Sequence, residues 1–174
     1  MTPRIRPFGL TIALAASALT SAYAHEAHQD PSLRAAAPHR PEIVSPVAVP
    51  LDPATLGTLP RQAVTTRVHE ATLHCEGVPL VLLLRAAGAI PEGRLGSPHL
   101  ARYVLAEGRD GYRVLFSLAE LDPETGGRAA FVVDRCDGGS LDEAAGPLRL
   151  LVPGDVRAAR SVRQLDSVTV VVAP

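Results

Sequence analysis

The chain has 174 residues and a net charge of −1, with 47% hydrophobic but only 3% aromatic residues. The near-neutral charge excludes an overall field that would draw the protein to nucleic acid or anionic lipid, so no nucleic-acid partner is expected. The hydrophobic content suffices for a real core. That core must be built from Val, Leu and Ala, because Trp is absent.

The first 24 residues have the features of a secretory signal peptide. Arg4 and Arg6 precede an apolar run over residues 8–19, and Ala22-Tyr23-Ala24 supplies an A-x-A cleavage site. The two arginines are not adjacent, which excludes a twin-arginine signal and favours export in the unfolded state. We expect a periplasmic or secreted protein, cleaved after Ala24 and without a membrane span after cleavage. An uncleaved anchor is the alternative.

A proline-rich stretch follows the cleavage site. Residues 25–50 hold five prolines and show neither a helical nor a strand period, which is typical of an extended linker. We place the linker at residues 25–49 and a single domain at residues 50–174, with ordered chain beginning near Val47. The linker either tethers the domain to a partner, such as a periplasmic protein, or is simply an unfolded tail.

The first half of the domain contains two helix signals around one strand signal. Asp52 followed by Pro53 predicts a helix that ends before Pro60. The β-branched stretch 62–75 predicts a strand. A second, apolar helix is expected over residues 80–87 and should end at Gly88.

The second half is dominated by short strands. Residues 103–107 and 112–116 flank an Asp-Gly turn, which predicts a hairpin. A capping box from Ser117 to Glu120 then begins a short helix. Further strands are expected at 130–134, 148–152 and 168–172. This pattern predicts an α+β fold with a β-rich core and short helices.

The two cysteines, Cys75 and Cys136, invite a disulfide in an oxidising compartment. Such a bond would close a loop of 61 residues and stabilise the fold by about 4 kcal/mol in the chain-entropy model. The alternative is a pair of separate buried thiols.

No metal site is expected. His69-Glu70 resembles the start of a zinc-protease motif, but that motif needs a second histidine at position 73, which is Leu73. His25 and His28 lie in the predicted linker, where we expect solvated histidines and not ligands of Cu(II) or Zn(II).

The strongest functional signal is an arginine-bearing loop near the C-terminus. An apolar strand ends at Pro153-Gly154, and Arg160, Ser161 and Arg163 follow. Two guanidinium groups, a hydroxyl and backbone N–H groups within four residues suit a phosphate or another oxyanion. The alternative is that these arginines only solvate a surface loop.

Three segments together resemble the sulfite oxidase-type molybdopterin-binding domain family. The first runs from Gly77-Val78-Pro79-Leu80 through the Leu-rich helix to Gly88. The second joins Asp110-Gly111-Tyr112 to the capping-box helix, and the third comprises residues 146–154 and 159–163. The order and spacing of these segments carry the resemblance, which covers most of the chain after the signal peptide.

The resemblance implies a β-rich molybdopterin-binding fold and a site for the pterin phosphate. The residues that would hold the phosphate are Arg149, Arg160, Ser161, Val162 and Arg163. Molybdopterin, or the molybdenum cofactor, is the implied ligand.

Three departures from the family pattern argue against catalysis. A family histidine is replaced by Ala145 and a family tryptophan by Gln164. Cys75 also lies too close to Gly77 to match the cysteine that ligates molybdenum.

Three hypotheses follow. The first is an exported molybdopterin-binding-fold protein of the oxidoreductase type, with weak or absent catalysis, that holds a pterin or another phosphorylated small molecule. The second is an active molybdenum oxidoreductase in which Cys75 would be the ligand. The third is a non-catalytic interaction module for a periplasmic protein.

Overall fold

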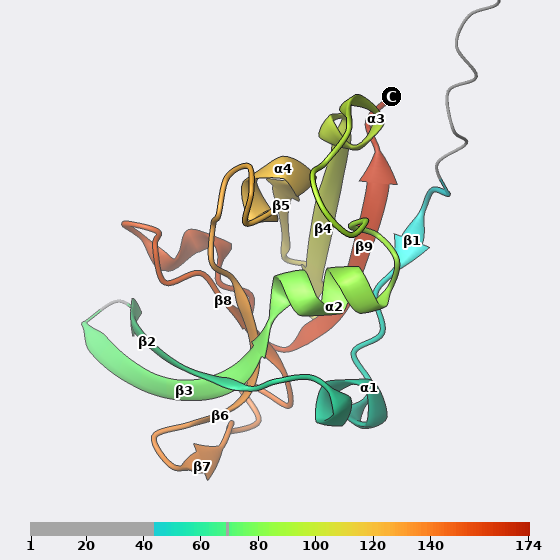
Figure 1. Cartoon of the computed structure of the whole chain (residues 1–174). Helices are drawn as coiled ribbons and strands as arrows, with labels where there is room; N and C mark the ends of the chain where they lie inside the picture. The colour runs from blue at the N-terminus through green and yellow to red at the C-terminus, as the bar shows by residue number, and fades with distance from the viewer. Residues whose placement is uncertain (1–43, 69) are drawn as a thin grey trace, which may run out of the picture. The chain divides into compact units, whose positions relative to one another are not determined.

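The computed structural model describes residues 44–68 and 70–174, all within one compact unit. Two antiparallel sheets make up most of it (Figure 1). The first sheet has the strand order β1 (Val47–Ala48), β9 (Leu165–Val172), β4 (Arg102–Gly108), β5 (Arg113–Ser117). The second has the order β2 (Gln62–Val68), β3 (Ala71–Pro79), β6 (Phe131–Cys136), β7 (Gly139–Ser140), and β8 (Arg149–Leu151) also pairs with β6.

The helices are short and connect the strands. They are α1 (Pro53–Thr58), α2 (Leu80–Ala86), α3 (Ser97–Leu100), α4 (Leu118–Leu121) and the 3₁₀ turn η2 (Ala158–Arg160). The prediction of an α+β, β-rich fold is therefore confirmed. None of the helices in the described part of the chain is long and apolar enough to cross a membrane.

Local signals placed several elements correctly. The Asp52 carboxylate accepts a hydrogen bond from the Thr55 N–H and caps α1. Both hydrogen bonds of the capping box between Ser117 and Glu120 are present at the start of α4. Gly88 adopts a positive φ of 68° directly after the C-cap of α2, a conformation that glycine adopts without steric cost.

The prediction of one strand over residues 62–75 is wrong. The segment forms two strands, because β2 ends at Val68 and β3 begins at Ala71, and the two pair as a hairpin. Residues 69–71 read His-Glu-Ala and contain none of the Gly, Pro, Asn or Asp residues that usually indicate a turn. The position of the hairpin turn therefore could not be predicted from the residue types.

Two hydrophobic cores hold the sheets. The larger lies between α2 and the first sheet and contains Leu80, Leu84, Phe116, Leu150 and Val170, among others. The smaller lies under the β2–β3 hairpin, and its buried members are Val64, Cys75, Val133 and Leu151. So small a core leaves the hairpin dependent on additional links to the rest of the sheet.

The disulfide is one such link. Cys75 of β3 and Cys136 of β6 face each other in the strand register and are bonded, which confirms the predicted pairing. The bond joins the hairpin covalently to β6, the strand that also pairs with β8.

Several sequence predictions fall outside the described residues. The signal peptide, most of the 25–49 linker, His25, His28 and His69 belong to this group. Val47 and Ala48, at the end of the predicted linker, form β1 and pair with β9.

Candidate functional site

The C-terminal arginine loop folds back beside the strand that precedes it. After β8 the chain turns through η2 and returns, so that the Leu150 N–H donates to the Val162 carbonyl at 2.8 Å and the Leu165 N–H to the Leu148 carbonyl at 2.8 Å. This pairing brings Ser161 and Arg163 alongside Arg149. Val162 between them is fully buried in the larger core, so its neighbours on either side point the other way.

Arg149 is the central group of this arrangement. It lies on the same face of β8 as Leu151, which belongs to the small core under the hairpin. Only 8% of the residue is exposed, and its Nε has no hydrogen-bond partner within the described residues. Burial lowers the pKa of Arg149, nearby Arg163 lowers it further, and Asp142 partly offsets both effects.

Ser161 and Arg163 add donors next to Arg149. The Ser161 Oγ accepts a hydrogen bond from the Val152 N–H at 3.3 Å, so the hydroxyl can direct its own proton elsewhere. Arg163 is exposed. Within the described part of the chain, neither Arg149 nor Arg163 forms a salt bridge.

Arg160 has a different environment. Its guanidinium donates to both carboxylate oxygens of Asp155, at 2.8 and 2.7 Å, and to Glu120 at 2.8 Å. It also lies 4.7 Å from the centre of the Phe116 ring. These contacts raise the pKa of Arg160, chiefly through the hydrogen bond to Asp155. Arg160 thus fastens η2 to α4 and the preceding loop.

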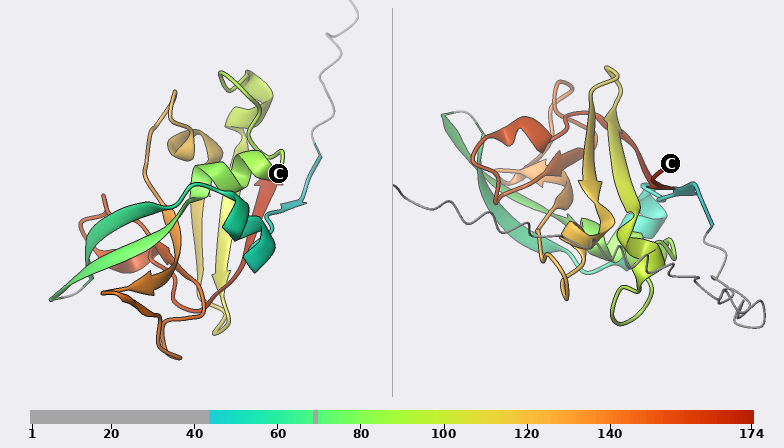
Figure 2. Two further views of the ribbon diagram at one scale, coloured as in Figure 1. Left: turned by 60° about the horizontal axis from the view of Figure 1, so that its bottom comes forward. Right: turned by 90° about the horizontal axis from the view of Figure 1, so that it is seen from above.

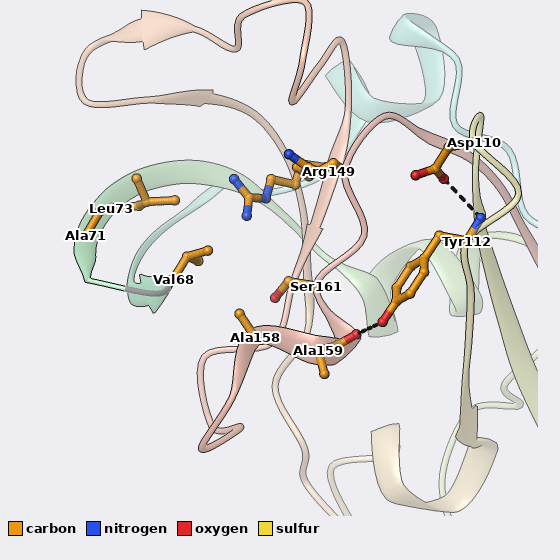
Figure 3. Close-up of a pocket in the computed structure, with 10 residues that line it drawn as sticks. Val68, Ala71, Leu73, Asp110, Tyr112, Arg149, Ala158, Ala159 and Ser161 are labelled. Carbon is orange, nitrogen blue, oxygen red and sulfur yellow. Dashed lines mark hydrogen bonds between the residues drawn. The ribbon is translucent and has the colours of Figure 1, made fainter.

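A cavity of about 500 Å³ opens beside Arg149, in the size range of small-molecule sites. Arg149, Ser161 and Arg163 line it, whereas Arg160 and Val162 do not. Figure 3 shows the Arg149 side chain extending towards the hairpin residues Val68 and Leu73. Three of the five predicted ligand residues are therefore brought together, and for the other two a binding role remains a prediction.

The remaining walls come from segments that sequence reasoning did not assign to a site. The β2–β3 hairpin contributes Val68, Ala71 and Leu73, and the turn between β4 and β5 contributes Asp110 and Tyr112. Both views of Figure 2 place the hairpin and the η2 segment on the same side of the domain. Of these two segments, only Asp110-Gly111-Tyr112 was singled out in the sequence, through its place in the family resemblance.

The residues present fit one end of a molybdenum cofactor and not the other. An unpartnered buried guanidinium, a second arginine and a hydroxyl suit its phosphate group. The metal would need a thiolate, yet the chain has only two cysteines and both are in the disulfide. The hypothesis that Cys75 ligates molybdenum is therefore wrong, because the bond to Cys136 removes the thiolate.

No other cluster of metal ligands takes its place. Nowhere in residues 44–68 and 70–174 do three or more His, Cys, Asp or Glu side chains gather closely enough to hold a metal ion. The two arginines and the hydroxyl that line the cavity are the groups suited to binding an oxyanion.

The comparisons with known proteins assign no family. No family model matches the chain, and no curated protein is similar to it in sequence.

Proposed function

We propose that this chain is an exported binding protein with a sulfite oxidase-type molybdopterin-binding fold and weak or absent catalysis. Its cavity holds the phosphate group of a pterin-like or other phosphorylated small molecule. Arg149, Ser161 and Arg163 bind the oxyanion, and Arg160 positions the loop that carries the last two.

The observation that carries this proposal is the burial of Arg149 without a partner. Removing a guanidinium from water is unfavourable unless its charge and donors are satisfied. Arg149 is more than nine-tenths buried, its Nε lacks an acceptor among the described residues, and its guanidinium borders a cavity. A bound oxyanion would supply the missing negative charge and would accept hydrogen bonds from the part of the guanidinium that borders the cavity.

The lack of a free thiol favours binding over catalysis. A molybdenum centre of this family would be anchored by a cysteine, and the disulfide leaves none. Export in the unfolded state, which the signal peptide predicts, also agrees with a protein that acquires its ligand after export.

Calorimetric titration of the chain lacking residues 1–24 with inorganic phosphate tests the proposal. We expect saturable binding that weakens about 10- to 100-fold in Arg149→Met, because a hydrogen bond to a charged group contributes about 1.5–3 kcal/mol. Arg85→Met is the matched control, since Arg85 is exposed at the end of α2 and lies outside the cavity. Equal phosphate binding by Arg149→Met and the unmodified chain would contradict the proposal.

Export is tested separately. Expression with residues 1–24 in a bacterium that has a periplasm should yield a periplasmic protein whose N-terminal residue is His25, as read by mass spectrometry. An intact N-terminus on a membrane-bound product would indicate the uncleaved anchor instead.

A further inference from the structure

The cavity beside Arg149 is polar on only part of its wall. Beyond the guanidinium, the lining from the hairpin is aliphatic and consists of Val68, Ala71 and Leu73. Ala158 and Ala159 of η2 also line it with methyl groups. An inorganic oxyanion would gain no binding free energy from contact with this apolar surface.

The hairpin residues are placed to receive a ligand. Val68 and Leu73 pack against the small core and remain partly exposed where they border the cavity. They are neither fully buried nor fully solvated. An apolar group that covers them would remove this surface from water, which is favourable in proportion to the area covered.

Tyr112 adds an aromatic side chain across from the hairpin. Its hydroxyl donates to the Ala159 carbonyl, so the polar end of the side chain is already satisfied. Figure 3 shows the ring on the opposite side of Ser161 from Val68 and Leu73. The residue is 47% exposed, which leaves ring surface available to a ligand.

The size of the cavity supports the same conclusion. At about 500 Å³ it is much larger than an inorganic phosphate, given that one water molecule occupies about 30 Å³ of liquid. A phosphate at Arg149 would leave most of the space, including both apolar walls, to water. An ester substituent on the phosphate would fill it.

We infer that the phosphorylated ligand of this cavity has an apolar or aromatic body, which lies between Leu73 and Tyr112 while its phosphoryl group lies at Arg149, Ser161 and Arg163. This inference rests on the proposed oxyanion site and narrows its ligand class. The body is held by contact with side chains and needs few hydrogen bonds, because the aliphatic side chains of the hairpin wall offer none.

A pair of phosphate monoesters separates the inference from the proposal on which it rests. Methyl phosphate and phenyl phosphate carry the same head group, and at about pH 8 both are dianions. We expect the unmodified chain to bind phenyl phosphate about tenfold more tightly in calorimetric titrations, from the apolar area that the ring covers.

Two Leu→Ser variants, one inside the cavity and one outside it, test where the body of the ligand lies. Leu73→Ser should reduce the phenyl-to-methyl preference to about twofold or less, because it replaces the aliphatic wall with a hydroxyl. Leu115→Ser should leave the preference unchanged, since Leu115 is 60% exposed on β5 and does not line the cavity. The comparison of the two esters in the unmodified chain does not depend on either variant folding.

The outcomes are distinct. Equal affinity for the two esters, with methyl phosphate binding lost in Arg149→Met, would overturn the inference and leave the oxyanion site standing. A phenyl preference that survives in Leu73→Ser would also overturn it, because the ring would then lie elsewhere. Failure of both esters to bind would remove the proposed function together with the inference.

Discussion

Arg149 carries a charge into a position that is more than nine-tenths buried, and no carboxylate compensates it within hydrogen-bonding distance in the described residues. Burial lowers the pKa of this guanidinium, so the folded protein stabilises its charged form less well than water does. The residue is therefore better suited to ligand binding than to stabilising the empty fold. Its partner across the strand pair is Val133, a buried aliphatic residue of the small core.

The uncompensated burial of the Arg149 charge predicts that Arg149→Met raises the stability of the ligand-free protein. Methionine is similar in length and removes the buried charge, so we expect a gain of about 1 kcal/mol or more in the free energy of unfolding. Urea unfolding of the two proteins in a buffer free of phosphate and sulfate measures it. A less stable Arg149→Met would mean that the guanidinium has a structural partner and is not held for a ligand.

Residue-level reasoning from sequence named three of the residues that line the cavity. Arg149, Ser161 and Arg163 were predicted, and the return of the chain beside β8 places all three at one cavity. Arg160 was grouped with them because the sequence shows its charge but not its neighbours. Asp155 and Glu120 lie 5 and 40 positions away, and only the fold brings both to its guanidinium.

At the scale of elements, the loop between β8 and β9 is fastened by the Asp155–Arg160 pair. The Arg160 guanidinium lowers the pKa of Asp155 below its usual value of 3.8. A carboxyl group whose pKa is lower in the folded state stabilises the fold above the unfolded-state value, and the contribution disappears as the pH falls through the folded-state pKa. The loop should therefore loosen only in acid.

Replacement of the carboxylate tests this fastening. We expect Asp155→Asn to lower the free energy of unfolding by about 1–2 kcal/mol at neutral pH, because a charge-assisted, two-point contact is lost. The difference should shrink as the pH falls below 3.8 towards the lower folded-state pKa of Asp155, because the carboxylate is then protonated. Urea titrations across this range measure it.

Asp166→Asn, at an exposed position of β9, serves as the control for the loss of one surface carboxylate. A difference between Asp155→Asn and the unmodified chain that does not change with pH would contradict the assignment to the ionised carboxylate.

The elements themselves were predictable where a local signal marked their ends. Asp52-Pro53, Gly88 and the capping box at Ser117 each fixed a boundary. The β2–β3 hairpin was missed because its turn has no characteristic residue, and the apolar wall of the cavity was missed with it. That wall depends on tertiary placement, since nothing in the sequence of β3 indicates that Leu73 faces Arg149.

At the scale of the whole molecule, the disulfide links β3 of the hairpin to β6, the strand that pairs with the β8 strand of Arg149 in the same sheet. Cys75 lies on β3, two residues beyond Leu73, and Cys136 lies on β6, the strand that pairs with β8. The small core beneath the hairpin has four buried members among the described residues. The disulfide therefore adds a covalent link to the β3–β6 pairing that holds the hairpin wall beside β8.

Reduction of this bond should destabilise the protein substantially. The 61-residue separation corresponds to about 4 kcal/mol in the chain-entropy model, as an upper estimate. Urea unfolding of the oxidised and reduced protein measures the loss, and a Cys75→Ser, Cys136→Ser double variant treated with the same reductant controls for its other effects. Equal unfolding midpoints for the oxidised and reduced protein would contradict this role.

The central claim, an oxyanion held by Arg149 in the cavity between the hairpin and the arginine loop, can be tested by direct observation. The measurement is a crystal structure of the chain without residues 1–24 grown with selenate, an oxyanion with phosphate-like geometry whose selenium is located by anomalous scattering. We predict a selenium peak in the cavity, with selenate oxygens within hydrogen-bonding distance of the Arg149 guanidinium and the Ser161 hydroxyl. Selenate bound only elsewhere on the protein, with the Arg149 guanidinium satisfied by protein groups, would contradict the claim.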